Sequence, residues 1–281
     1  MSELTATMYG LASAVTWGAG DFYGGFASRK ADVLRVVILS QTIGLALMFV
    51  AAVIVNEPLI SLTDLFWSMA AGASSGWGLI LYYAALARGS MTAVAPITGV
   101  LAAVVPAVTG AFIEGPPSLF QAIGFVFAFV SIGLVTGLEP RKLRADTQLL
   151  FAILGGTSFG MFLVLIGQVS EGSSLYPLAF SRITTIALAF TIATATKPLK
   201  PLRKGLGFAT AAGVFDALGS LFYLLARHEG RLDVAAVLSS LYPISTVVIA
   251  KLLLKETLGR KRTTGILFAA IATVLINTST I

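Results

Sequence analysis

Three ionisable side chains lie inside long apolar stretches of the sequence. Asp21, Arg182 and Asp216 each have mainly apolar or small neighbours for a helix turn or more on both sides. A charge at the centre of a membrane-spanning helix costs about 2.5–3.5 kcal/mol on insertion scales. These residues are therefore the first candidates for contact with a solute or a proton. The structural alternative is that Arg182 forms a buried ion pair with Asp21 or Asp216, which would fix helix packing without adding net stability.

The residues around Asp216 predict a polar face on its helix. Asp216, Gly219, Ser220 and Tyr223 fall at positions i, i+3, i+4 and i+7, which share one face of an α-helix. That face would present a carboxylate, a hydroxyl and an aromatic ring around a small gap. If a carboxylate met Arg182 in one state and lost it in another, it could bind and release a proton.

A second face of this kind surrounds Asp21. Trp17, Asp21, Gly24 and Ser28 fall at positions i, i+4, i+7 and i+11. Solute sites are mostly apolar with a few placed polar groups, so aromatic side chains near these carboxylates would suit a planar or partly apolar solute. The predicted solute-binding residues are Trp17, Asp21, Gln41, Trp77, Tyr82, Arg182, Asp216, Tyr223 and Tyr242. For the aromatic members the alternative is packing against helices or lipid headgroups.

The composition places these residues in a membrane protein. Hydrophobic residues make up 57% of the 281 residues and charged residues only 11%, whereas a soluble domain has about 25% charged residues. Apolar segments of about 20 residues, the length that crosses a bilayer, follow one another with short polar breaks, which leaves no room for a soluble domain. Residues 1–10 lack a basic region and a cleavage site, so the first helix is expected to act as the insertion signal.

The residue types argue against several chemistries. The chain has no Cys and a single His, His228, so disulfides, thiolate catalysis and zinc sites are not expected. Neither an HExxH motif nor a GxxxxGK[ST] motif is present, which argues against a zinc protease and against ATP-driven transport. The net charge of +6 comes from short basic clusters at helix ends, which suit anionic lipid headgroups better than nucleic acid. No cofactor is expected.

Apolar runs and polar breaks predict ten helices. These are 4–27, 33–55, 64–87, 91–113, 118–137, 148–169, 174–196, 206–228, 233–254 and 262–280. The break at 138–146 divides them into two units of five, 1–140 and 141–281. An odd number of crossings makes the second unit enter the membrane from the opposite side. The predicted fold is an all-α integral membrane protein, with ten transmembrane helices forming two inverted five-helix repeats around a central cavity.

A weak internal repeat supports this division. A shift of 141 residues superposes seven identical residues within a 25-residue window, from Ala71 on Ala212 to Ala95 on Ala236. Tyr82 falls on Tyr223, and each is followed seven residues later by Gly. The same shift brings Gln41 within one position of the place that matches Arg182, which is why Gln41 joins the predicted site.

Three prolines inside predicted helices are candidate hinges. Pro96 and Pro106 lie in the fourth helix, and Pro243 lies in the ninth, its counterpart in the other unit. Proline removes a helical hydrogen bond and kinks the helix, so each could mark a hinge or a break that lines the site. A tolerated transmembrane proline is the structural alternative.

Lys and Arg are distributed unequally between the connections. Fifteen of them lie in or beside the odd-numbered connections and two, Arg227 and Arg231, in the even-numbered ones. Short cytoplasmic loops are enriched in Lys and Arg. The count therefore predicts odd-numbered connections in the cytoplasm and both termini outside.

The two units have the same residue types in the same order. A Tyr, an Ala and a Gly lie around the end of the third helix, a Glu ends the next helix, and a further Gly follows. These residues are Tyr82, Ala85, Gly89, Glu114 and Gly124, followed by Tyr223, Ala226, Gly230, Pro243, Glu256 and Gly265. With Trp17-Gly18-x2-Asp21-Phe22 and Arg182, they resemble the EamA type of the drug/metabolite transporter (DMT) superfamily over essentially the whole chain. Glu114 and Glu256 are expected to pair with basic neighbours at the membrane face, with gating as the alternative.

The resemblance implies a ten-helix inverted repeat that moves small metabolites such as amino acids, sugars, nucleosides or drugs. It also implies cytoplasmic termini, opposite to the Lys and Arg count, so orientation and the direction of transport stay open. The first unit has Leu101-Ala102 where the second has Pro243. The two fourth-helix breaks therefore need not be symmetric.

The predicted function is secondary active transport of small organic metabolites, amino acids or related solutes, by alternating access with proton coupling or exchange; the protein is not expected to be an enzyme. A sugar, nucleoside or drug facilitator of the same fold is the nearest alternative. A membrane-embedded enzyme or a non-transporting membrane partner is the alternative from another class. Expected partners are a small-molecule solute, membrane lipid and protons, but no nucleic acid. We expect a monomer or weak homodimer in the inner (plasma) membrane of a bacterial or archaeal cell.

Overall fold

The structure is a computed structural model that describes residues 3–113, 118–136, 147–170, 174–196, 205–229, 238–239, 241–256 and 259–277. Within these residues the regular secondary structure is entirely helical. The long helices of the first half are α1 Glu3–Ser28, α2 Val33–Ile54, α3 Leu62–Arg88, α4 Met91–Ile113 and α5 Leu119–Thr136. Those of the second half are α7 Thr147–Ile166, α8 Leu175–Thr196, α9 Leu206–Glu229, α11 Tyr242–Leu254 and α12 Arg260–Asn277.

The ten long helices of the described chain confirm the predicted fold class. Four of them, α2, α7, α8 and the Leu206–Tyr223 part of α9, are each long and apolar enough to cross a membrane by themselves. Large apolar side chains are exposed on the outer surface, with Phe112 at 87% and Leu62 at 85%. In a bilayer these side chains face lipid, so the protein is an integral multi-pass membrane protein.

Polar residues at the connections begin and end these helices. Asp32 caps α2 by accepting a hydrogen bond from the Leu34 N–H at 3.1 Å. Ser61 caps α3 by accepting one from the Asp64 N–H at 3.1 Å, and Gly89 closes the other end of that helix. Side-chain caps of this kind replace the hydrogen bonds that a helix terminus lacks.

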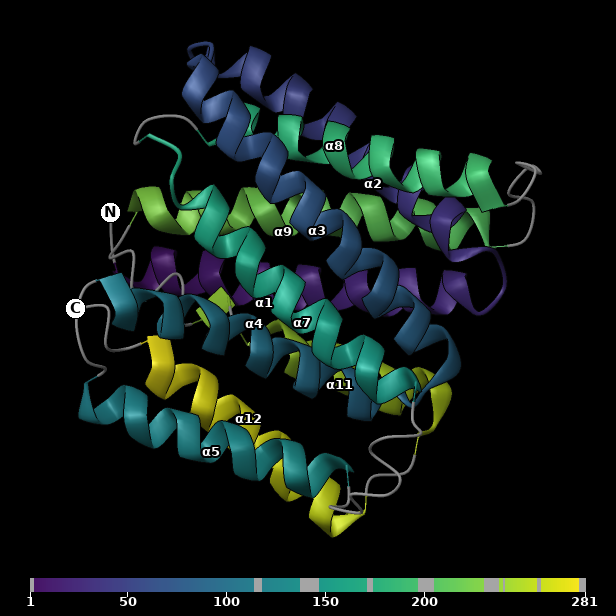
Figure 1. Cartoon of the computed structure of the whole chain (residues 1–281), viewed down its shortest axis with the longest axis vertical. Helices are drawn as coiled ribbons and strands as arrows, with labels where there is room; N and C mark the ends of the chain where they lie inside the picture. The colour runs from purple at the N-terminus through teal and green to yellow at the C-terminus, as the bar shows by residue number, and fades with distance from the viewer. Residues whose placement is uncertain are drawn as a thin grey trace.

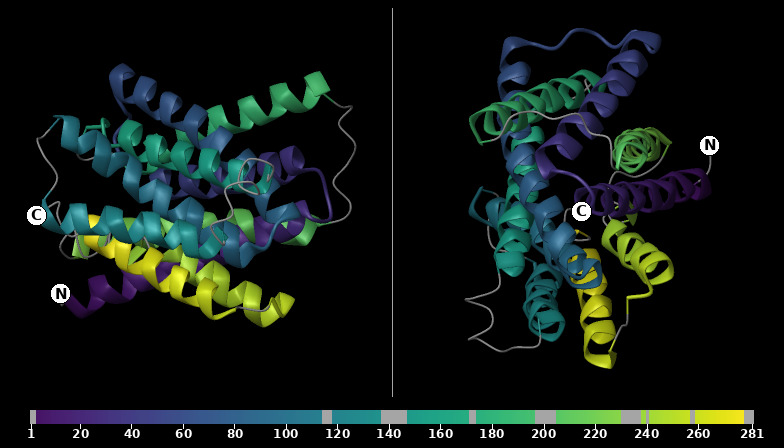
Figure 2. Two further views of the ribbon diagram at one scale, coloured as in Figure 1. Left: turned by 60° about the horizontal axis from the view of Figure 1, so that its bottom comes forward. Right: turned by 90° about the vertical axis from the view of Figure 1, so that its right-hand side faces the viewer.

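Helices of the first half pack mainly against helices of the second. α1 lies along α9, α2 along α8, α3 along α7, and α5 along α12. Figure 1 shows α1 and α9 side by side across the middle of the molecule, with α5 and α12 together at its lower edge. The right-hand view of Figure 2 shows α1 and α9 at a height between α8 above and the α5–α12 pair below. The centre of the molecule is therefore built by both halves.

The structure describes the predicted helix 233–254 only in part, because its start lies outside the described residues, whereas Leu238 and Ser239 are helical. Residues 231–237 lie outside the described chain, and α11 begins at Tyr242 with Pro243 in its first turn. Leu241 is the N-cap residue, and its N–H donates to the Leu238 carbonyl at 3.2 Å. Pro243 therefore starts a helix and does not lie in the helix interior. Proline suits this position because the first turn needs no N–H from it.

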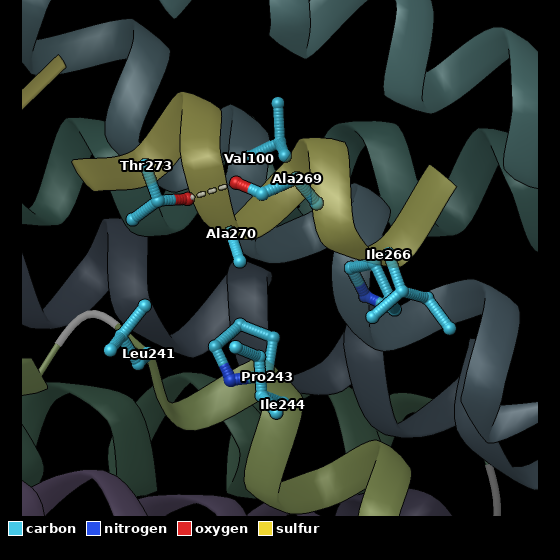
Figure 3. Close-up of a pocket in the computed structure, with 9 residues that line it drawn as sticks. Val100, Leu241, Pro243, Ile244, Ile266, Ala269, Ala270 and Thr273 are labelled. Atoms are coloured by element: carbon cyan, nitrogen blue, oxygen red, sulfur yellow. Dashed lines mark hydrogen bonds between the residues drawn. The ribbon is translucent and has the colours of Figure 1, made fainter. Parts of the chain in front are cut away.

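Pro96 and Pro106 do lie inside α4, as predicted. Pro96 and Pro243 line the same small apolar pocket between α4, α11 and α12 (Figure 3). Gly99 of α4 packs directly against the Pro243 ring, where a Cβ would collide with it. The two predicted hinge regions thus meet in space, although a hinge motion itself stays a prediction.

Candidate solute-binding site

An ion pair between α8 and α9 is the centre of the site. Arg182 Nη2 lies 2.6 Å from Asp216 Oδ2 and also donates to Ser220 Oγ at 3.3 Å. Arg182 Nη1 donates to the Leu178 carbonyl at 3.3 Å. The Arg182 side chain is 7% exposed, whereas that of Asp216 is 31% exposed. The carboxylate is therefore the accessible member of the pair.

Helix α2 encloses the buried side of Arg182. A Cβ on Gly44 would lie 2.7 Å from Arg182 Nε, so this close approach requires glycine. Gln41 lies one helix turn from Gly44, on the same face of α2, and is 7% exposed. Arg182 Nε itself has no hydrogen-bond partner among the described residues. The repeat-related residues Gln41 and Arg182 thus belong to neighbouring helices around one ion pair.

Asp21 of α1 lies on the other side of the pair. The Tyr82 hydroxyl of α3 donates a hydrogen bond to Asp21 Oδ2 at 3.2 Å. Gly20 packs on the α9 backbone at Asp216, with a Cβ position 3.2 Å from the Asp216 nitrogen. The α1 backbone next to Asp21 therefore lies against the α9 backbone at Asp216. Both halves of the chain therefore contribute a carboxylate to one small region.

Aromatic rings stand next to the carboxylates. The Trp17 ring lies 5.7 Å from Tyr223 with planes tilted by 34°, and 6.4 Å from Tyr242 at 79°, an edge-to-face arrangement. Gly219 makes room for this group, because a Cβ there would collide with the Trp17 indole. Trp17 precedes Asp21 by one helix turn on the same face of α1. The aromatic group and the carboxylates are thus adjacent.

The structure does not bring Trp77 into this group. Trp77 and Tyr82 are five residues apart on α3, which places them about 140° apart around the helix. Tyr82 is fully buried, whereas Trp77 is 48% exposed. Contact of Trp77 with a solute stays a prediction.

The sequence patterns missed some neighbours of the site. Tyr83 packs its ring against Gly24 of α1, one helix turn from Asp21. Thr246 of α11 donates to the Gly18 carbonyl at 3.1 Å. Neither contact has a local signal, because each joins helices far apart in the sequence. The position of Tyr83 directly after the predicted site residue Tyr82 is the one sequence feature that could have indicated it.

A second polar cluster lies at the end of the bundle where α1 and α3 finish. Glu256 accepts hydrogen bonds from the Met91 N–H at 3.2 Å and the Thr92 N–H at 3.1 Å. It also accepts one from the Ser90 hydroxyl at 2.8 Å and lies 3.5 Å from Arg29 Nη2. The predicted pairing of Glu256 with a basic neighbour is therefore present, whereas Glu114 lies outside the described residues.

The described residues contain no group of three or more His, Asp or Glu side chains that could hold a metal ion. The fold and site instead define a polytopic membrane protein with two packed halves around a polar, aromatic centre. The model of the EamA-like transporter family matches residues 4–137 and again residues 147–278. The chain belongs to this family, which is part of the DMT superfamily.

Two further similarities agree with this assignment. An uncharacterized protein of Methanocaldococcus jannaschii is 28% identical over 135 residues, which are 48% of this chain and 98% of that protein. A solved structure described only as a crystal structure of a protein aligns with a TM-score of 0.65 and 14% identity, covering 97% of each chain. The second likeness concerns the fold alone. The family is one of transporters and not of enzymes.

Proposed function

We propose that this protein is a secondary active transporter of small organic metabolites, amino acids or related solutes, that works by alternating access. The observation that carries the proposal is the Arg182–Asp216 ion pair with Asp21 nearby, in the apolar interior between the two halves. Membership of a transporter family supports it. In transporters built from inverted repeats, solute and coupling-ion sites lie near the bilayer midplane between the repeats.

The charges in this region suit exchange of a proton for a solute. Asp216 pairs with Arg182 in the present arrangement. Asp21 has only the Tyr82 hydroxyl as its hydrogen-bond partner within the described chain. A motion of α1 and α9 relative to α8 would change which carboxylate Arg182 neutralises. The carboxylate that loses Arg182 would then take a proton or a positively charged group of the solute.

Transport by purified protein in proteoliposomes tests this function. Radiolabelled amino acids or the amines related to them should accumulate under an imposed pH gradient and leak out when a protonophore removes the gradient. Asp216→Asn should lower the uptake rate by at least 10-fold and flatten its dependence on pH, because it removes the accessible carboxylate. Lys251→Gln, a charge change on the exposed surface of α11, is the control. Unchanged uptake and pH dependence in Asp216→Asn would refute the proposal.

A facilitator for sugars, nucleosides or drugs is the second candidate, and the Trp17–Tyr223 contact favours it, since flat rings suit stacking. The same proteoliposome experiment distinguishes the secondary active transporter from the facilitator. A facilitator would equilibrate its solute without accumulating it, and the protonophore would have no effect. We place the protein in the inner (plasma) membrane of a bacterial or archaeal cell, where fractionation of the expressing cells tests its location.

A further inference from the structure

We propose that the central site selects organic monocations: protonated amines or quaternary ammonium groups attached to an aromatic or aliphatic body. Among the solutes of the proposed transporter, this selects amines related to amino acids that lack the carboxylate group, and it therefore rests on that function. The groups that carry it are the two carboxylates Asp21 and Asp216 and the aromatic group of Trp17, Tyr223 and Tyr242.

The charge balance of the site is negative. Two carboxylates share one guanidinium, and that guanidinium is committed to Asp216 at 2.6 Å. Within the described chain Asp21 accepts one hydrogen bond, from the neutral Tyr82 hydroxyl, and forms no ion pair. The site with both carboxylates ionised thus lacks one positive charge, which a monocation supplies.

The accessible surfaces of the site favour a cation over an anion. Asp216 is 31% exposed, whereas its partner Arg182 is 7% exposed and closed off by Gly44 on its Nε side. An anionic solute would meet the carboxylate before it reached the guanidinium. With a neutral solute bound, Asp21 would have to take a proton or keep an uncompensated charge in an apolar interior, which is costly.

The aromatic rings provide the second half of a cation site. Ammonium groups are attracted to the faces of Trp and Tyr rings within about 6 Å of the ring centre. Trp17 stands one helix turn from Asp21, with Tyr223 tilted against it and Tyr242 at its edge. A cation held by Asp21 would therefore lie next to the indole. Gly219, which leaves room for that indole, would then act as a positioning residue.

The test compares probes of one shape that differ in charge. Phenethylamine, phenethyl alcohol and phenylacetate are each titrated onto the purified full chain at neutral pH, with thermal stability and tryptophan fluorescence as readouts. Choline and its neutral isostere dimethylbutanol form a second pair. We expect each cation to bind at least 10-fold more tightly than its neutral partner, and phenylacetate to give no stabilisation.

Variants of the site locate the effect. Asp21→Asn should remove the preference of phenethylamine over phenethyl alcohol, and Asp21→Glu, which keeps the charge, should retain most of it. Trp17→Leu should weaken binding of both cations by about 5-fold or more, whereas Trp67→Leu near the start of α3, where the indole packs against Phe66, should not. Asp32→Asn is the matched control, because it removes a carboxylate from the α2 N-cap while asparagine still caps.

Equal binding of charged and neutral probes, tighter binding of phenylacetate, or no stabilisation by either cation would overturn the selectivity for cations. So would an unchanged preference in a folded Asp21→Asn protein. The proposed transport function fails separately, if proteoliposomes accumulate no solute of any charge. If the proteoliposomes accumulate only neutral or anionic solutes, the transport function holds and the proposed selectivity for cations is wrong.

Discussion

The buried guanidinium of Arg182 and the more accessible carboxylate of Asp216 form an unequal ion pair. A pair that served packing alone would have no need to leave its carboxylate in reach of a solute, and a buried pair adds little net stability in any case. Asp21 stands beside this pair with a single hydroxyl as its hydrogen-bond partner in the described chain. At the scale of residues, the site is therefore arranged for an incoming positive charge or proton.

The small size of Gly219 should matter both for stability and for binding at the site. We expect Gly219→Ala to lower the free energy of unfolding by about 1–3 kcal/mol, because the new methyl group collides with the Trp17 indole. The displaced indole should also weaken phenethylamine binding. Gly207→Ala is the control in α9, since a Cβ there meets nothing within 4 Å. Equal melting temperatures of the two variants would contradict this packing account.

Two carboxylates join the halves at opposite ends of the bundle. Glu256, between α11 and α12, accepts hydrogen bonds from the first turn of α4. Glu57, between α2 and α3, accepts hydrogen bonds from the Ser174 N–H at 2.8 Å and the Tyr176 N–H at 3.1 Å at the start of α8. Each thus holds the positive end of a helix dipole from the other half. A relative motion of the halves would have to change or carry along these contacts.

The Glu256 contact should make stability depend on pH. Burial alone would raise the pKa of Glu256, but the hydrogen bonds from Thr92, Ser90 and Met91 outweigh it and hold the pKa below its usual value. A lowered pKa stabilises the fold above the unfolded-state value, about 4.3 for glutamate. The contribution is lost as the pH falls from there through the lower folded-state pKa.

Glu256→Gln should therefore lower the free energy of unfolding at neutral pH by about 1–2 kcal/mol, and the melting temperature should fall with it. It should also weaken the loss of stability between neutral and acidic pH. Thermal denaturation of wild type and variant from pH 7 to pH 3 measures both effects. Arg260→Gln, an exposed charge change at the same end of the bundle, is the control. Parallel pH curves for wild type and Glu256→Gln would show that the contact carries no pH dependence.

Most helix positions could be predicted because apolar runs and polar breaks are local features. The start of α11 could not, since proline is tolerated both inside a membrane helix and in a first turn, and only the Leu241 backbone settles which. Periodicity and the repeat grouped Trp17 with Asp21 and Tyr82 with Tyr223. The Tyr82–Asp21 hydrogen bond and the Glu57 cap could not be predicted, because they depend on how distant helices pack.

At the scale of the whole molecule, the site belongs to neither half alone. Asp21 and Tyr82 come from the first half, whereas Arg182, Asp216 and Tyr223 come from the second. Helices of opposite halves lie side by side throughout the bundle (Figure 1). A rocking of one half against the other would therefore change the site itself, which is what alternating access requires.

Alternating access is the central claim, and the absence of Cys from the chain allows a direct measurement. Tyr223→Cys places a single thiol beside Trp17, and a membrane-impermeant maleimide is applied to either side of oriented vesicles. We predict that the thiol reacts from both sides in separate experiments, and that saturating phenethylamine slows both reactions. Labelling from one side only, under all solute and pH conditions, would contradict the account.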